Sequence, residues 1–337
     1  MTRKHPDYQK MMLDPGTHPT ATRRVKYEET RFSRLYKTGS EVFKIRKTSA
    51  THASLAIKEV YAQEALQLGK RWAPSTYQAV VAITQQDGRF ALGGAGAPVD
   101  YAVRMAQLPD HYFVDYLAAH NKLNPTTLGR IARFLASQHA EWPATDAQSA
   151  DIGRPDYFAE LVEEVFYQAK KYFGVGLTAA MYELFSRPMA HFLEHHRKVF
   201  LRRQKKNRVV QVHGAFLPQH VFVKQQDLEA ISPLESPRKL RLLDAASDVA
   251  QFVNGLHLLG TAEEADAFAK RYAAAAKDRD LERILPAYQV YQAAREGVMC
   301  CEWSTELPAE DEQREKLRDD ALRLFTLAVD VARTLPK

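Results

Sequence analysis

The stretch that most constrains the fold of this sequence runs from Val209 to Ala250. Short apolar runs predict one strand over Val209–Val212, a second over His220–Lys224 and a third apolar segment over Ala230–Leu234. A His-Gly turn separates the first two, and a helix is predicted to begin near Asp244. Loops between short neighbouring strands place their side chains close together, and such an arrangement can hold phosphate and metal.

The N-terminal third of the chain alternates apolar and polar residues in the way that antiparallel strands do. The run Lys26–Lys47 predicts a hairpin with its turn over Lys37–Ser40, and a helix is predicted over Thr51–Trp72, ended by Pro74. Further strands are predicted over Tyr77–Thr84, Phe90–Leu92 and Val99–Leu108. Together these segments predict an antiparallel sheet packed on one helix.

From Pro109 onward the pattern is helical. Asn124 followed by Pro125 is a typical helix start, and Thr261–Glu264 reads as a capping box. Helices with apolar stripes are predicted over Asn124–His139, Tyr157–Tyr172, Leu177–Gln204, Leu285–Trp303 and Asp311–Thr334.

The composition is that of an ordinary soluble globular protein, with 45% hydrophobic and 26% charged residues. The net charge of +6 fits an anionic ligand or partner, but plain cytoplasmic proteins share it. Cys300 and Cys301 are adjacent on a predicted helix and cannot easily pair with each other, which favours a reducing compartment. The first residues lack the apolar core of a signal peptide, and no run approaches a membrane span. We therefore expect a cytoplasmic protein with no membrane partner.

Several segments, in order, resemble the aminoglycoside phosphotransferase family of small-molecule kinases over about residues 25 to 305. They are the Thr38-Gly39 turn, the Val42–Ile45 strand, the His213-Gly214 turn with His220, and the Asp244–Ala250 segment. The resemblance implies an α+β, bilobal protein-kinase-like fold, with an antiparallel-sheet N-lobe over residues 25–108 and a mainly helical C-lobe over residues 109–337. Residues 1–24 are polar and proline-containing, and we expect them to form a tail or a loosely docked arm.

Two acids of the family pattern are missing from this chain. In the family the turn reads His-Gly-Asp and a later strand carries Ile-Asp, whereas here Ala215 and Ser232 stand at those positions. One such carboxylate orients the attacking hydroxyl, and the other holds Mg²⁺ against the phosphates. Ala215 has no acceptor, and the Ser232 hydroxyl is a poor ligand for Mg²⁺. A positioned general base alone is worth about 100- to 10,000-fold in rate, so the resemblance implies a degenerate member without the usual Mg²⁺ site.

The resemblance also implies a nucleotide site in the N-lobe. Lys44 would neutralise nucleotide phosphates, with Glu64 as its ion-pair partner. The alternative is an exposed lysine and a solvated surface glutamate. Met105 and Gln107 fall where a kinase hinge would lie against an adenine ring, so ATP or another nucleotide is the implied cofactor.

Other family positions are retained. The resemblance implies that Glu235, Asp244 and Asp248 brace the loop, and for Asp244 and Asp248 helix N-terminal capping is the alternative. For His213 and His220 we expect hydrogen-bonded structural roles, although two histidines can also hold a transition metal.

A basic run, Arg197–Arg208, ends the helix predicted before the first of the short strands. Cations suit a helix C-terminus, and a charged run is usually a solvated face. The alternative is a patch for phosphate, nucleic acid or an acidic partner. Aromatic residues are not interleaved in the way typical of nucleic-acid binding, so nucleic acid is disfavoured.

Three functional hypotheses follow. The favoured one is a pseudokinase that binds a nucleotide, a metabolite or a protein without efficient phosphoryl transfer. The second is an active ATP-dependent small-molecule kinase in which Glu235 or Asp244 has taken over the metal. The third is a structural module with a closed cleft, whose basic run contacts a partner.

Overall fold

The computed structural model describes residues 7–20, 22–47, 54–235 and 238–337. The chain divides into two compact units. Unit 1 comprises Met1–Tyr112 and Phe222–Glu235, and unit 2 comprises Phe113–Val221 and Ser236–Lys337. The sequence assigned residues 222–235 to the C-terminal lobe because they follow it along the chain, but their contacts place them in unit 1.

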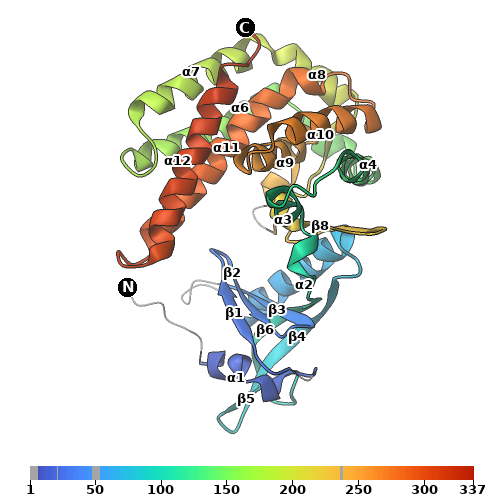
Figure 1. Ribbon diagram of the computed structural model, residues 1–337, viewed down its shortest axis with the longest axis vertical. Coiled ribbons are helices and arrows are strands. Elements are labelled where there is room, and N and C mark those ends of the chain that lie inside the picture. The colour runs from blue at the N-terminus through green and yellow to red at the C-terminus, as the bar shows by residue number, and fades with distance from the viewer. Residues whose placement is uncertain (1–6, 21, 48–53, 236–237) are drawn as a thin grey trace. The chain divides into compact units, whose positions relative to one another are not determined.

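The centre of unit 1 is an antiparallel sheet of six strands in the order β1-β2-β3-β6-β4-β5. One long helix, α2, packs against β3, β4 and β6 (Figure 1). The elements are β1 Lys26–Glu29, β2 Ser33–Lys37, β3 Glu41–Arg46, α2 Leu55–Trp72, β4 Tyr77–Gln86, β5 Arg89–Leu92 and β6 Ala97–Ala106. The predicted antiparallel sheet and its single helix are confirmed.

The predicted hairpin is a three-strand meander. Its second turn lies where the sequence put it, at Gly39, whose φ of +94° suits glycine. The first turn was missed: the Ser33 amide donates to Thr30 Oγ1 at 3.0 Å, which breaks the predicted first strand into β1 and β2. Polar residues that hydrogen-bond their neighbours offer such turns without any glycine or proline signal.

Helix α2 begins after Ser54, whose hydroxyl accepts the Ile57 amide, and it ends at Trp72, as predicted, with Ala73 as its C-cap before Pro74. The predicted first residues, Thr51–Ala53, lie outside the described residues. Gly69 is required inside this helix because a Cβ there would collide with the Tyr77 ring.

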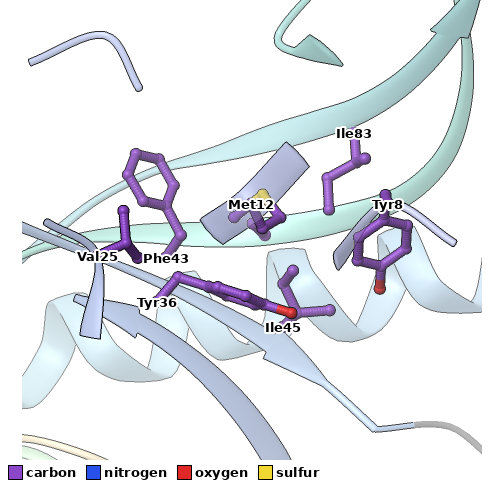
Figure 2. Packing of buried hydrophobic residues seen from close by; sticks show 8 residues of the cluster. Tyr8, Met12, Val25, Tyr36, Phe43, Ile45 and Ile83 are labelled. Atoms are coloured by element: carbon purple, nitrogen blue, oxygen red, sulfur yellow. The ribbon is translucent and has the colours of Figure 1, made fainter. Parts of the chain in front are cut away.

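The expectation of an N-terminal tail is wrong for the described part of residues 1–24. Helix α1, Gln9–Leu13, packs beside the sheet of unit 1, where Tyr8 is 5% and Met12 0% exposed. Figure 2 shows both side chains in one apolar cluster with Tyr36, Phe43 and other sheet residues. His18 adds a hydrogen bond from Nε2 to the Met12 carbonyl, at 2.9 Å. The prolines and the glycine of this segment suggested a loose arm. The burial of Tyr8 and Met12 was not predicted, because scattered buried residues leave no periodic pattern in the sequence.

A short hairpin, β8 Val221–Lys224 and β9 Asp227–Ala230, belongs to unit 1 apart from Val221. Glu229 of β9 accepts hydrogen bonds from the Ser75 amide, at 2.8 Å, and from the Ser75 and Thr76 hydroxyls, and so joins the hairpin to the turn after α2. Strand β9 lies earlier in the chain than the third segment predicted over Ala230–Leu234. It ends at Ala230, and residues 231–235 have no regular structure.

Unit 2 is helical, with a two-stranded antiparallel sheet of β7 Val209–Gln211 and β10 Leu242–Asp244. Helix α11 lies beside α12, α9 and α6, and Phe158 of α6 stacks on Tyr288 of α11 with ring centroids 4.1 Å apart. The helices are α3 Val114–Ala119, α4 Pro125–Glu141, α5 Asp146–Ile152, α6 Pro155–Ala169, α7 Ala179–His195, α8 Arg197–Lys205, α9 Ala246–Leu258, α10 Ala262–Ala275, α11 Leu281–Glu306 and α12 Glu312–Ala332 (Figure 1).

Two predictions within unit 2 are wrong in detail. The helix predicted over Leu177–Gln204 is interrupted at His196, which ends α7 and precedes α8. The capping box at Thr261 is absent: α10 begins there, but the Thr261 hydroxyl donates to the Leu256 carbonyl at 2.9 Å and makes no cap. The preceding helix end competes for the hydroxyl, and that tertiary contact is invisible in the local sequence.

Within the described residues, no helix combines the length and the apolarity needed to cross a bilayer.

Candidate functional site

Lys44 is the central cation of unit 1. It lies on β3, and its Nζ is 2.6 Å from Glu235 Oε1. Arg46, two residues further along β3 and therefore on the same face, lies 3.4 Å from Glu235 Oε2. Burial would lower the pKa of Lys44, but the charge of Glu235 opposes this and the net pKa is raised. Lys44 is therefore a charged ammonium held at a fixed position.

A pocket in unit 1 opens beside this pair. Its polar lining is Lys44, Arg46, Lys58, Asp100 and Glu235, and the rest is aromatic or small and apolar, including Tyr61 and Tyr101. The Arg46 guanidinium lies 4.4 Å from the centroid of the Tyr61 ring, and Lys58 Nζ lies 3.0 Å from Asp100 Oδ2. Three cations face two carboxylates, so the lining carries a net positive charge.

The carboxylate beside Lys44 comes from Glu235 and not from Glu64, which the sequence suggested as its partner. Glu64 lies half-buried on α2, and the described acids that line the pocket are Asp100 and Glu235. The family resemblance identified a lysine and a helix glutamate, but it could not show that an acid 191 positions away folds back onto β3.

Met105 and Gln107 lie at the end of β6 and just beyond it. Met105 is buried and pairs in register with Val42 and Tyr77. Gln107 Oε1 accepts a hydrogen bond from the backbone amide of Gly39 at 2.9 Å, and the backbone amide of Gln107 donates to the Ser40 carbonyl. Gln107 thus supports the glycine turn between β2 and β3.

Ser232 follows β9 in a strained conformation, with φ of +58°. Its amide donates to the Tyr77 hydroxyl at 3.0 Å, and burial raises the pKa of Tyr77. This contact fixes the backbone of Ser232 against β4 and does not involve the Ser232 hydroxyl.

In unit 2, the loop from His213 to Phe216 is held by hydrogen bonds to at least one backbone group of each of its four residues. The His213 and Gly214 amides donate to Asp248 at 2.7 and 2.8 Å. Gln251 accepts the Phe216 amide and donates to the Gly214 carbonyl. His220 Nδ1 donates to the Ala215 carbonyl at 2.9 Å. A rigid loop therefore presents the methyl group of Ala215.

Asp248 is the anchor of this loop and is fully buried on α9. Besides the two amides, it accepts a hydrogen bond from His139 Nε2 at 3.0 Å. Because a carboxylate only accepts, Nε2 carries the proton, and the Tyr272 hydroxyl, 2.7 Å away, can donate to Nδ1. Burial alone would raise the pKa of Asp248, but these partners hold the pKa below its ordinary value.

Asp244 makes a different contact, with Arg203 of α8. Arg203 is 1% exposed, and its guanidinium binds Asp244 through Nε and Nη2 at 2.6 and 2.7 Å. The same group binds Asp278 twice, at 2.8 Å. Asp244 Oδ1 also accepts the Ala246 amide at the start of α9, which is helix N-terminal chemistry.

The basic run Arg197–Arg208 is thus no uniform solvated face. Arg203 is buried, and three other cations pair with acids elsewhere in unit 2: Arg197 with Asp156, and Arg202 and Lys206 with Asp280. A run of cationic residues in the sequence does not show which of their side chains are buried. This internal pairing reduces the charge that remains to attract an anionic partner.

The described residues fit a nucleotide better than Mg²⁺. Lys44, Arg46 and Lys58 are suitable groups for phosphate. For Mg²⁺, the oxygens of Glu235 already contact Lys44 and Arg46, those of Asp244 contact Arg203, and Ala215 offers no oxygen. Among the residues that the structure describes, no three His, Cys, Asp or Glu side chains group as metal ligands. His213 and His220 accordingly form no such group.

The sequence matches no protein-family model and no curated protein. Solved structures do match. A choline kinase from Cryptosporidium parvum aligns with a TM-score of 0.54 at 11% identity, over 97% of this chain and 96% of that one. A choline/ethanolamine kinase family protein from Mesorhizobium loti gives 0.53 at 10%, over 97% and 99%. A Ralstonia eutropha protein named after the aminoglycoside phosphotransferases gives 0.50 at 13%, over 98% and 97%.

The chain has a kinase-like fold. The kinase-like fold that the sequence resemblance implied is confirmed, and so is the α+β class. At 10–13% identity the likeness concerns the fold alone.

Sequence reasoning missed several residues of the kinase-like fold. Glu229, Arg203, Asp278 and Gln251 each bind a segment far away in the chain. Arg203 and Asp278 carried no signal beyond their charge. Gln251 lies three residues after Asp248 on α9 and therefore on the same face, which was a usable clue.

Proposed function

We propose that this protein is a pseudokinase that binds a nucleotide through the Lys44 pocket and transfers phosphate inefficiently or not at all. The observation that carries the proposal is the loop His213–Phe216. Its backbone is held by Asp248, Gln251 and His220, yet its projecting side chain is the methyl of Ala215.

Phosphoryl transfer depends on positioning and on carboxylates that handle a proton and a metal. The proposal holds that the positioning remains in this chain and that the carboxylates do not. Lys44 supports nucleotide binding, because an ammonium fixed by Glu235 and flanked by Arg46 and Lys58 suits a triphosphate.

The test is a thermal denaturation series with ATP, ADP and adenosine, each with Mg²⁺ or with a chelator. We expect ATP to stabilise the protein without Mg²⁺, by about 2.7 kcal/mol at a concentration 100 times the dissociation constant. Adenosine should stabilise it less, because it carries no phosphate for Lys44.

Lys44→Met should remove most of the thermal stabilisation by ATP. The matched control is Lys316→Met, the same chemical change at an exposed site on α12. This control should keep the full stabilisation by ATP. If ATP, ADP and adenosine all fail to stabilise the wild-type protein, the module binds no nucleotide and the proposal is wrong.

Phosphate release distinguishes the rival enzyme. Wild-type protein with ATP and Mg²⁺ should release phosphate no faster than a protein-free blank, and Ala215→Asp combined with Ser232→Asp should create measurable hydrolysis. Mg²⁺-dependent release by the wild type that disappears in Glu235→Gln would establish an active kinase with a relocated acid instead.

A further inference from the structure

His191 and His195 lie one turn apart near the C-terminal end of α7, and both side chains are exposed. Residues at positions i and i+4 of a helix share a face. Their ring centroids are 4.0 Å apart, and the ring planes differ by 30°. At this separation, small rotations of the side chains bring one nitrogen of each ring to a common ion.

The hydrogen bond of His195 fixes which of its nitrogens is available. Nδ1 lies 2.9 Å from the His191 backbone carbonyl, and a carbonyl only accepts. Nδ1 therefore carries a proton, and in the neutral ring Nε2 has the lone pair that a metal needs. Histidines that bind metals usually donate their other ring N–H to a carbonyl or carboxylate in this way, and the contact orients the ring.

The backbone beneath the pair is anchored. Phe192 is fully buried, and its ring stacks on His196 with centroids 4.6 Å apart. The order His191-Phe-Leu-Glu194-His195 is also the His-x-x-Glu-His order in which some zinc enzymes carry two ligands and a glutamate on one helix. Here the helix face is exposed, and no third His, Cys, Asp or Glu completes a ligand group within the described residues.

The neighbouring charges permit a cation. Glu194 is exposed between the two histidines and contributes a negative charge. Arg187, one turn before His191, pairs with Glu183, and Arg197 pairs with Asp156 at 2.5 Å. Lys198 is exposed and opposes binding to some extent.

We propose that His191 and His195 form an open, two-histidine site for a divalent transition metal, with water at the remaining positions. Neutral imidazole suits Cu²⁺, Ni²⁺ and Zn²⁺, whereas Mg²⁺ and Ca²⁺ prefer oxygen ligands. Of these ions Cu²⁺ should bind most tightly, following the general order of affinities for divalent metals. The site is independent of the Lys44 pocket and of the proposed nucleotide binding.

The experiment is calorimetric titration of the metal-free, full-length protein with Cu²⁺, Zn²⁺ and Mg²⁺. We expect one equivalent of Cu²⁺ or Zn²⁺ that His191→Ala and His195→Ala each weaken by about tenfold or more, and no Mg²⁺ binding that depends on either histidine. Both side chains are exposed, so the thermal midpoint without metal should not change.

The matched control is His120→Ala. His120 is exposed at the end of α3, and its Nδ1 makes the same contact, 2.8 Å from the Tyr116 carbonyl. Its ring stacks on Tyr116 instead of on a second histidine, with centroids 3.8 Å apart. This variant should bind Cu²⁺ as the wild type does.

Electron paramagnetic resonance of the Cu²⁺ complex gives a second readout. The wild type should show two imidazole nitrogens, and either single variant at most one. Cu²⁺ affinity unchanged in His191→Ala and His195→Ala, or an equal loss in His120→Ala, would show that the ion binds to surface histidines without preference, and the proposal would be wrong.

Discussion

Lys44 in unit 1 and Arg203 in unit 2 are both held by carboxylates, but the balance of charge around them differs. Near Lys44, the pocket lining has three cations for two acids. Around Arg203, two buried acids, Asp244 and Asp278, use both edges of one guanidinium, which is 1% exposed. The excess cations beside Lys44 suit a negatively charged ligand. The charged groups of the Arg203 cluster are paired with one another, and we interpret that cluster as structural.

The largest effect should come from Arg203→Met. The substitution leaves Asp244 buried without its cation and leaves Asp278 only the longer contact with Arg208 Nε, at 3.8 Å. Breaking a buried ion pair in this way costs about 3–5 kcal/mol. The free energy of unfolding, measured by urea denaturation, should fall by that amount. Arg202→Ala, which removes a half-exposed partner of Asp280, should cost less than about 1 kcal/mol. Equal losses in both variants would remove the contrast between the clusters.

Asp248→Asn should have an intermediate effect of about 1.5–3 kcal/mol, because it weakens charge-assisted hydrogen bonds from two amides and His139. The pKa of Asp248 is lower in the folded protein than its ordinary value of 3.8. Its contribution is therefore complete above about pH 4 and is lost as the pH falls through the lower, folded pKa.

The measurement is the free energy of unfolding of both proteins between pH 2 and pH 6. The difference between wild type and Asp248→Asn should shrink below pH 3.8. A constant difference across this range would show that the charge of Asp248 does not hold the loop.

Lys44→Met should have a smaller effect on stability than Arg203→Met, below the range of about 3–5 kcal/mol for a stranded buried charge. Glu235 keeps Arg46 at 3.4 Å and faces the pocket, so its charge is not stranded as in the Arg203 cluster. Urea denaturation of this variant beside Arg203→Met gives the comparison directly. A loss as large as that of Arg203→Met would indicate that Lys44 is a structural residue.

The sequence predicted the parts of this molecule that depend on local pattern. The strands of unit 1, the start of α4 at Asn124 and the glycine turn at Gly39 follow from alternation, capping and backbone preference. These signals lie within a few residues of the element that they specify. Family resemblance extended them to a kinase-like fold.

The rest depends on contacts between distant segments. Lys44 meets Glu235 across 191 positions, and Arg203 meets Asp278 across 75. The cations of a charged run look alike in sequence, although Arg203 is buried and Lys205 and Lys206 are exposed. Which acid reaches which cation is set by the packing of whole helices, and no local pattern records it.

The packing of Met12 and Tyr8 has a consequence for any shortened version of this protein. A chain trimmed to begin at Val25, where the family resemblance starts, would lack two side chains of the apolar cluster in Figure 2. It would also strip Asp100 of the hydroxyl that Tyr8 supplies at 2.8 Å, and Asp100 lines the Lys44 pocket. Tyr8 and Met12 thus belong to the packed core of unit 1, and trimming them would expose the apolar side chains that they cover.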